Sequence, residues 1–254
     1  MTQASNWTTT VRSIGIVHSP WKGSRQVPVP GAPAQVEVFA DYEDALDGIE
    51  RTSHIVIVSF LDRANRDALR TKPQKLSLTA PEWGVFASRS PARPNPIGIS
   101  ATRLVSRHGL RLDVNPLDLA DGTPVLDIKS YSPGWDSVFS ACSIRRVAST
   151  MLAEPLLVAF LQRDLDNFLG DNATSDVAQQ ALRALVQAVG ALAVDPRDSG
   201  LQMHVRSCGM LAEALMGMTG ACLSNGRLVL DGDASDGKVR FCYKGNVFVV
   251  RADE

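Results

Sequence analysis

Arginine and asparagine side chains on a proline-rich segment form the most informative chemical pattern of the sequence. Residues 84–100 read GVFASRSPARPNPIGIS, with Arg89, Arg93 and Asn95 placed among the prolines. Each proline fixes its own φ and keeps the preceding residue out of the α region, so we expect an extended, stiff loop. Two guanidiniums and an amide on such a loop suit an anionic or planar ligand, because little entropy is lost on binding. The alternative is a plain connection whose arginines pair with local carboxylates.

A second polar pattern follows at residues 117–131. The Asp-Gly pair at 121–122 predicts a turn, and Asp127, Lys129 and Tyr131 alternate onto one face of the strand after it. A carboxylate, an amine and a phenol on one face could bind a polar ligand or move a proton. The alternative is a strand whose polar face simply meets water.

Other reactive residues show no motif of a known catalytic or metal site. The chain has four histidines and four cysteines, without the spacing of a zinc-binding helix and without a Cys-x-x-Cys pair. Trp21, in the segment HSPW, is interpreted as a core or rim aromatic, and His54 as a buried histidine that opens an apolar strand. Dinucleotide, P-loop and nucleophile-elbow motifs are missing as well, which argues against those enzyme classes. We expect no metal.

Short apolar runs divided by turn residues must position these groups. The first 144 residues predict one helix, at 43–49 with Asp41 as N-cap. They also predict strands at 14–17, 35–39, 54–61, 84–87, 97–104, 109–114 and 124–128. The third of them is apolar on both faces, so we expect a buried central strand there. Many short strands at near-even spacing indicate a barrel or a sandwich.

The pattern changes near residue 145. Helical periodicity predicts helices at 155–168, at 175–192 with Ser175 or Thr174 as N-cap, and at 211–216. Alternating apolar residues predict strands at 228–230, 239–243 and 247–250. We therefore expect a mainly β protein with a β domain at 1–144 and a smaller α+β domain at 145–254.

Composition and charge limit the possible partners. The 254 residues carry 26 basic and 27 acidic side chains, which excludes a globally basic nucleic-acid coat. Residues 51–112, however, carry eleven basic and three acidic side chains, a patch that could meet a phosphate backbone or simply be a solvated face. There is no signal-peptide pattern and no apolar run near 18 residues. We expect a soluble, cytoplasmic protein with no membrane contact and with reduced, mostly buried cysteines.

Taken together, four segments resemble the TsaA-like or TrmO family of S-adenosylmethionine-dependent tRNA methyltransferases. They are IGIVHSPW at 14–21, GIERTSHIVIV at 48–58, GVFASRSPARPNPIG at 84–98 and LDLADGTPVLDIK at 117–129. The resemblance implies a small β-barrel that binds S-adenosylmethionine near the subunit interface of a homodimer. It also implies methylation of the exocyclic nitrogen of threonylcarbamoyladenosine, the modified base beside the anticodon of tRNA.

The resemblance also implies which residues form the site. Binding of S-adenosylmethionine is expected at Ser19, Pro20, Trp21, Ser53, His54, Arg89, Ile99, Asp118, Leu119, Ala120 and Asp121. Contact with RNA or substrate at Arg93 and Asn95 is a separate hypothesis, which the resemblance does not itself supply. Asp127, Lys129, Tyr131 and His54 are candidates for the group that removes a proton, and the sequence does not choose among them.

Some parts of the chain depart from the family pattern. Residues 72–83 read KPQKLSLTAPEW, where the family has a stretch like Pro-Arg-Leu-Gly-Gly. Residues 145–254 resemble the family only weakly, and we expect them to help to select the RNA. Two alternatives stay open: a barrel methyltransferase for another small or nucleotide substrate, and a non-catalytic regulator that binds S-adenosylmethionine or RNA. The nearly intact donor segments favour an enzyme.

Overall fold

The computed structural model describes residues 8–72, 80–137, 152–206, 209–231 and 238–251. The chain divides into two compact units. The first contains Met1–Thr71 and Trp83–Ala141, and the second contains Lys72–Glu82 and Cys142–Glu254. The domain boundary that the sequence predicts, between residues 144 and 145, lies outside the described residues.

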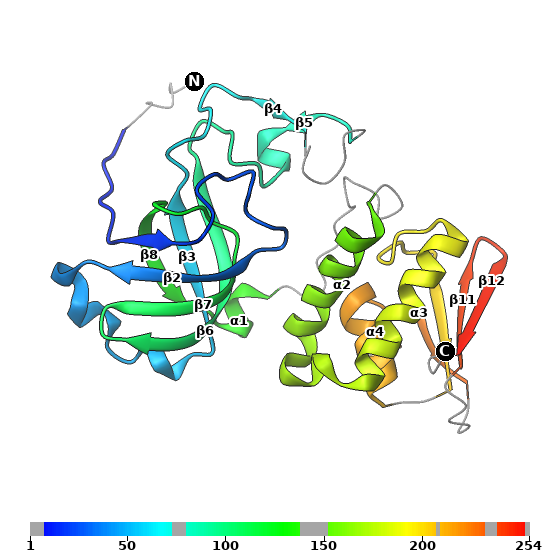
Figure 1. Ribbon diagram of the computed structural model, residues 1–254. Helices are drawn as coiled ribbons and strands as arrows, with labels where there is room; N and C mark the ends of the chain where they lie inside the picture. The colour runs from blue at the N-terminus through cyan, green and yellow to red at the C-terminus, as the bar shows by residue number, and fades with distance from the viewer. Residues whose placement is uncertain (1–7, 73–79, 138–151, 207–208, 232–237, 252–254) are drawn as a thin grey trace, which may run out of the picture. The chain divides into compact units, whose positions relative to one another are not determined.

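The first unit is a closed β-barrel, as the sequence predicts (Figure 1). Its strands follow the order β1-β2-β7-β6-β3-β8, and each neighbouring pair is antiparallel. Their bounds are β1 Gly15–His18, β2 Ala32–Val38, β3 His54–Phe60, β6 Ile97–His108, β7 Arg111–Leu117 and β8 Pro124–Ser130. β4 (Arg70–Thr71) and β5 (Trp83–Gly84) form a small ribbon within the connection from β3 to β6.

Alternating side chains fill the barrel. In β3, Ile55 and Ile57 are completely buried, whereas Val56 and Val58 point outward and stay partly exposed. β3 is therefore buried on one face and not on both, which corrects the sequence prediction. Each fully buried aliphatic side chain contributes about 1.5–3 kcal/mol of apolar transfer energy, so the inward residues hold the barrel together.

Close backbone packing also requires a glycine in the proline-rich motif. A Cβ atom at Gly98 would collide with the hydroxyl oxygen of Ser59, which lies opposite on β3. The Ser59 side chain is buried, so the collision could not be relieved toward solvent. Gly98 thus lets β6 start close to the end of β3.

Two predicted elements of the first unit differ in the structure. Residues 84–87 were expected as a strand, but Val85–Ala87 form a 3-10 turn, η3, because the Ser88 N–H bonds the Val85 carbonyl at 3.1 Å. The helix expected at 43–49 is replaced by two 3-10 segments, η1 at Ala40–Leu46 and η2 at Ile49–Arg51. The residue at the N-cap of η1 is Phe39 and not Asp41. Gly48, at φ 76°, interrupts the helical path between the two segments.

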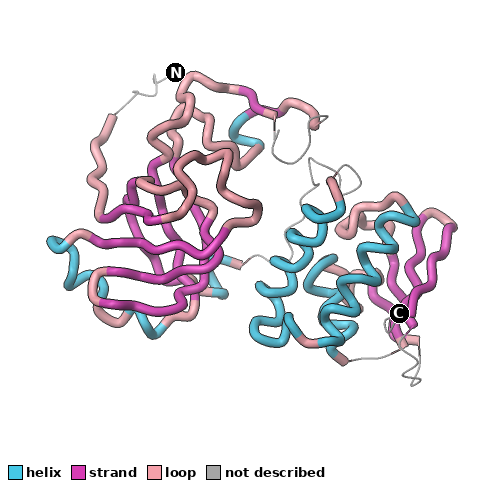
Figure 2. Tube along the Cα trace, viewed as in Figure 1, coloured by secondary structure: helices cyan, strands magenta, loops and turns pink. Residues whose placement is uncertain are grey.

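The second unit combines helices with a four-stranded sheet and confirms the predicted α+β class (Figure 2). Its helices are α2 Glu154–Leu169, α3 Asp176–Leu192 and α4 Met210–Thr219. The sheet has the order β10-β9-β11-β12, with β9 Gln202–Val205, β10 Leu228–Leu230, β11 Lys238–Tyr243 and β12 Asn246–Arg251. Ser175 caps α3 by accepting the Ala178 N–H, as predicted. β9 and the short helix α1 (Pro133–Asp136) of the first unit were not predicted.

Cys222 and Cys242 carry free thiols and are half-buried, so the expectation of buried thiols is too strong for these two. Cys142 and Cys208 lie outside the described residues. Within the described ranges, no helix combines the length and the apolar character needed to cross a bilayer.

Candidate functional site

Two loops that are about a hundred residues apart in sequence lie side by side at one end of the barrel. We call residues 19–22 and 118–122 the paired loops, and the end where β1, β3 and β7 finish the loop end. The Ser19 N–H donates to Asp121 Oδ1 at 3.1 Å, and the Asp121 N–H donates to the Trp21 carbonyl at 2.7 Å. The structure thus brings together Ser19, Pro20 and Trp21 with Asp118, Leu119, Ala120 and Asp121, as the predicted site requires.

Two basic residues reinforce the paired loops, and sequence reasoning had not singled out either. Lys22 Nζ lies 2.6 Å from Asp121 Oδ2. Arg63 donates to the Lys22 carbonyl at 2.7 Å and, more weakly, to the Asp121 carbonyl at 3.4 Å. The Lys22 ammonium, and then the Ser19 N–H, hold the pKa of the Asp121 carboxyl below its usual 3.8. Asp121 is therefore ionised at neutral pH and acts as an electrostatic link between the loops.

The paired loops also contain polar groups suited to a ligand. Among the described residues, the Trp21 indole N–H is buried without a hydrogen-bond partner. Such a buried donor costs about 1–3 kcal/mol until an acceptor reaches it. The Asp118 side chain is exposed and accepts the Ser100 hydroxyl at 2.6 Å. Leu119 and Ala120 are buried, so only their backbone groups can contribute to binding.

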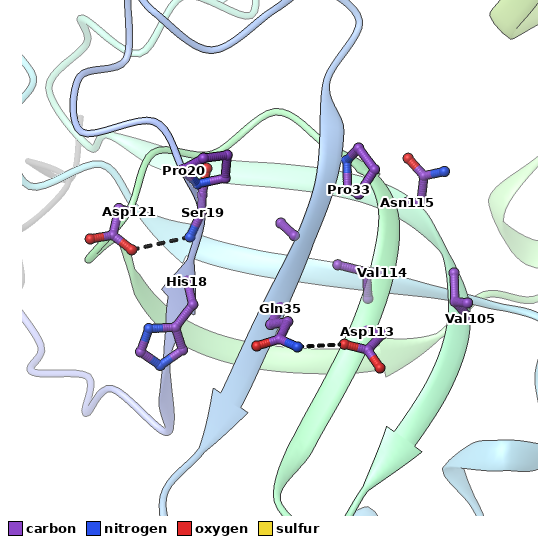
Figure 3. Close-up of a pocket in the computed structure, with 11 residues that line it drawn as sticks. His18, Ser19, Pro20, Pro33, Gln35, Val105, Asp113, Val114, Asn115 and Asp121 are labelled. Atoms are coloured by element: carbon purple, nitrogen blue, oxygen red, sulfur yellow. Dashed lines mark hydrogen bonds between the residues drawn. The ribbon is translucent and has the colours of Figure 1, made fainter.

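An open cavity of about 590 Å³ adjoins the paired loops (Figure 3). Ser19, Pro20 and Asp121 border it on one side. The barrel wall supplies Gln35, Val105 and Asp113, which sequence reasoning missed. Their signal was weak, because Gln35 and Asp113 lie in ordinary alternating strands and Val105 lies just beyond the predicted strand at 97–104.

Local irregularity shapes the wall of this cavity. Val105 is the extra residue of a β-bulge, since Leu104 pairs with Val114 and Ser106 pairs with Asp113. A bulge redirects the side chain at that point, and Val105 is 60% exposed. Gln35 Nε2 donates to Asp113 Oδ1 at 2.8 Å. The Ser106 hydroxyl, followed by this amide, lowers the pKa of Asp113, so the wall carries a fixed negative charge.

The proline-rich loop is held by one of its own arginines. Arg93 Nε donates to the Ser90 carbonyl at 2.8 Å, and Arg93 Nη2 donates to the carbonyls of Val85 (3.1 Å) and Ser88 (2.5 Å). These bonds give Arg93 a structural part in the loop, while its contact with RNA stays a prediction. Arg89 and Asn95 are exposed on the same loop.

Other predicted residues lie on the outer wall of the barrel. Val58 pairs with Ile99 on one side and with Asp127 on the other, which puts these three side chains in one row. Val56 pairs in the same way with Ala101 and Lys129. Because neighbouring strands are about 4.8 Å apart, Ile99 and Asp127 are separated by about 10 Å across this row. We call this surface of β8, β3 and β6 the side face.

Ser53 and His54 lie at the opposite end of β3, which we call the far end. Six residue steps of about 3.3 Å separate His54 from Phe60, so about 20 Å lies between the two ends of the strand. The His54 ring lies 6.2 Å from the Tyr131 ring, and the Ser53 hydroxyl lies 3.0 Å from His54 Nδ1. Burial, and then the Arg103 charge, lower the pKa of His54 from 6.5. Within one chain, Ser53 and His54 are not brought to the paired loops.

The candidates for a general base do not converge on the paired loops either. Asp127 and Tyr131 border a second cavity, of about 810 Å³, whose wall includes Ser130 and Ser132 at the far end. Lys129 Nζ lies 2.7 Å from Asp127 Oδ2, and this hydrogen bond raises the pKa of the lysine. A lysine held protonated in this way is a poor base at neutral pH. The Tyr131 hydroxyl lies 2.7 Å from Ser137 Oγ. With His54 at the far end as well, the structure selects no base among the four candidates.

Comparison with known proteins points to one family. The model of the tRNA-methyltransferase O N-terminal domain matches residues 16–137. A probable S-adenosyl-L-methionine-binding protein of Archaeoglobus fulgidus is 45% identical over 135 residues, which are 52% of this chain and 36% of that protein. A second S-adenosyl-L-methionine-binding protein of the same organism is 41% identical over 132 residues, 50% of this chain and 93% of that protein.

An Escherichia coli relative has a more specific name. The tRNA (adenine(37)-N6)-methyltransferase of strain K12 is 37% identical over 138 residues, which are 49% of this chain and 58% of that protein. The match thus spans just over half of the Escherichia coli relative and about a third of the first Archaeoglobus fulgidus relative.

Proposed function

The chain belongs to the tRNA-methyltransferase O family through its barrel, and from this membership we propose that it methylates tRNA with S-adenosylmethionine. The acceptor is the exocyclic N6 nitrogen of the adenosine beside the anticodon, in its threonylcarbamoyl form. The name of the Escherichia coli relative supports the adenine N6 as acceptor, and the names of the archaeal relatives support the methyl donor. The observation that carries the proposal is the convergence of residues 19–22 and 118–122 at one end of the barrel.

The groups at the paired loops fit the methyl donor. S-adenosylmethionine, when bound, supplies an electrophilic methyl group on a positively charged sulfur. Its ribose hydroxyls and ammonium are donors that the carboxylates of Asp118 and Asp121 can accept. Its carboxylate suits the guanidinium of Arg89, which is exposed on the neighbouring loop. The buried Trp21 N–H requires an acceptor, and the donor carries several.

The protein's own contribution to the reaction is mainly positioning. Methyl transfer is an in-line displacement, in which correct placement of the reacting atoms supplies a large share of the rate. Asp121, Lys22 and Arg63 hold the paired loops in place, and Arg93 holds the loop that carries Arg89. The accepting nitrogen loses one proton when it gains the methyl group. Asp127 and Tyr131 border the other cavity, so we assign no general base to this proton.

We extend the proposal to a homodimer that works in the cytoplasm, where tRNA is found. The side face exposes apolar residues on β6, with Ile97 46% and Ile99 60% accessible, next to the partly exposed Val56 and Val58. Apolar side chains exposed next to one another on two neighbouring strands are typical of a surface that another chain covers. Replacing Ile99 by Lys should shift the protein from dimer to monomer in sedimentation experiments. An unchanged dimer would exclude the side face as the interface.

A methyl-transfer assay tests the proposed function. Labelled S-adenosylmethionine is incubated with the protein and with total tRNA that carries or lacks the threonylcarbamoyl group. Label in the modified tRNA alone is the expected result. Donor binding measured by calorimetry without any labelled tRNA would contradict the tRNA assignment, and favour another acceptor or a regulatory role.

A further inference from the structure

Phe86 is an aromatic side chain that the fold presents to solvent. It lies in η3, on the connection between β3 and β6, and is 83% exposed. Leu69, on the same connection, is 66% exposed. The two belong to one locality, because the Val85 N–H donates to the Leu69 carbonyl at 3.0 Å. Burying a phenylalanine would contribute about 1.5–3 kcal/mol, so a ring left in water at this place indicates a surface for a partner.

The support of this ring is rigid. Val85, directly before Phe86, bonds Leu69 through its N–H and accepts both Ser88 N–H and Arg93 Nη2 through its carbonyl. Arg93 also binds the Ser88 and Ser90 carbonyls. The backbone on both sides of Phe86 is thus fixed before any ligand arrives, and an aromatic side chain has few rotamers to lose. Such a platform binds a flat partner at low entropic cost.

The charge around the ring favours a polyanion. The part of the connection that belongs to the first unit, residues 61–71 and 83–96, carries five basic and two acidic side chains. Arg66 is exposed among them. Two copies of this face would repel each other, whereas the phosphates of a nucleic acid would be attracted. An exposed aromatic ring among basic residues is the combination with which proteins hold unpaired bases.

The connection also belongs to the loop end of the barrel. Arg63, near its start, binds the carbonyls of Lys22 and Asp121 in the paired loops. The Leu61 N–H donates to the Pro96 carbonyl at 2.8 Å, which closes the connection at its base. A nucleotide held by this connection therefore lies at the same end of the barrel as the proposed donor site.

We propose that Phe86 stacks on an unpaired base of single-stranded RNA, while Arg66 contacts a neighbouring phosphate. The inference rests on the proposed function and specifies how the same site holds its acceptor. An anticodon loop offers unstacked bases, and aromatic side chains are the usual partners of such bases. Phe86 is thus a positioning residue that holds the RNA and does not act on the transferred methyl group.

The test uses the full chain with Phe86→Ala, Phe86→Trp and, as a control, Trp135→Ala. Trp135 is 90% exposed and follows β8 at the far end, so it is an equally accessible aromatic outside the proposed surface. The probes are a synthetic anticodon stem-loop RNA and the same RNA with its loop paired to a complementary strand. RNA affinity, donor affinity by calorimetry, and the KM and kcat for tRNA are measured for each variant.

Three results together support the inference. Phe86→Ala weakens binding of the open loop and raises the KM for tRNA by roughly 5- to 150-fold, the range that corresponds to loss of one base–aromatic stack. Its affinity for S-adenosylmethionine stays as in the wild type. So does its weak binding of the RNA whose loop is base-paired to the complementary strand. Phe86→Trp and Trp135→Ala both keep wild-type affinity for the open loop, because the first retains a stacking ring and the second lies elsewhere.

Other results overturn it, and they separate its failure from failure of the proposed function. Wild-type affinity and KM in Phe86→Ala, with wild-type methylation of tRNA intact, remove Phe86 from the RNA surface and leave the function standing. A change from dimer to monomer in Phe86→Ala, without loss of RNA affinity, assigns the ring to a subunit contact. A wild-type protein that neither binds nor methylates tRNA refutes both proposals.

Discussion

The two ends of the barrel differ in how their polar groups are organised. At the loop end, the carboxylate and backbone of Asp121 bind Ser19, Trp21 and Lys22, so that distant segments form one unit. At the far end there is a larger cavity, of about 810 Å³ against about 590 Å³, but the Asp127–Lys129 pair beside it links residues two apart on one strand. Cavity size alone therefore does not identify the site. The hydrogen bonds between distant segments at the loop end indicate where the fold holds ligand-binding groups in fixed positions.

Among substitutions that test this difference between the two ends, Asp121→Asn at the loop end is expected to have the largest effect on donor affinity. Loss of the charge weakens the bond to the Ser19 N–H and removes the attraction of Lys22, and hydrogen bonds to charged groups contribute about 1.5–3 kcal/mol. Affinity for S-adenosylmethionine should fall by roughly 10- to 100-fold in calorimetry. Asp41→Asn, an exposed carboxylate in η1, is the matched control and should leave affinity unchanged.

The same carboxylate predicts a pH dependence. The pKa of Asp121 is lowered in the folded protein, so its contribution to stability is fully present above the unfolded value of about 3.8. That contribution is lost as the pH falls below 3.8 and through the lower folded value. The Tm difference between wild type and Asp121→Asn should therefore be constant from pH 8 to about 5 and shrink in stronger acid. A difference that disappears near neutral pH would contradict the ionised link.

A smaller effect is expected from Arg93→Ala at the loop end. Removing three bonds to carbonyls frees the proline-rich loop, so affinity for RNA should fall by about 10-fold. The slope of log affinity against log salt should stay the same, because Nε and Nη2 bind the protein backbone and not phosphates. Arg93→Lys should not restore affinity, since a single ammonium cannot replace the several fixed N–H donors of the guanidinium. Arg51→Ala, exposed in η2 at the far end, is the control; a flatter slope in Arg93→Ala alone would return Arg93 to the RNA surface.

The smallest effect is expected at the far end, from His54→Gln. Because His54 is about 20 Å from the loop end of β3, donor affinity should change by less than about 2-fold. The pKa of His54 is lowered by burial, so its contribution to stability is complete above pH 6.5 and is lost as the pH falls through the lower folded value. The His54→Gln variant should therefore lack the decrease in Tm that the wild type shows as the pH falls from 6.5 through the folded pKa of His54. A large loss of donor affinity would mean that His54 reaches the site from a second copy of the chain.

Local patterns were sufficient for much of the fold. Period-two alternation predicted β2 and β8, and a helical stripe with Ser175 as cap predicted α3. Both are short-range signals, because each depends on which side of one element faces the core. The prediction of a strand at 84–87 was wrong because it used only short-range signals. These residues are apolar, as in a strand, but the hydrogen bonds of Val85 to Leu69 and to Ser88 close a turn. Those partners are set by the path of the connection.

The sequence by itself determined the barrel strands, the helices of the second unit and the stiff arginine-bearing loop, since these follow from periodicity and from the geometry of proline. Only the tertiary structure decided that residues 19–22 meet residues 118–122, that Lys22 and Arg63 hold them, and that Ser53 and His54 lie at the far end. The reason is that antiparallel register and strand length set distances between segments. The residues next to a segment in the sequence do not indicate which distant loop packs against that segment.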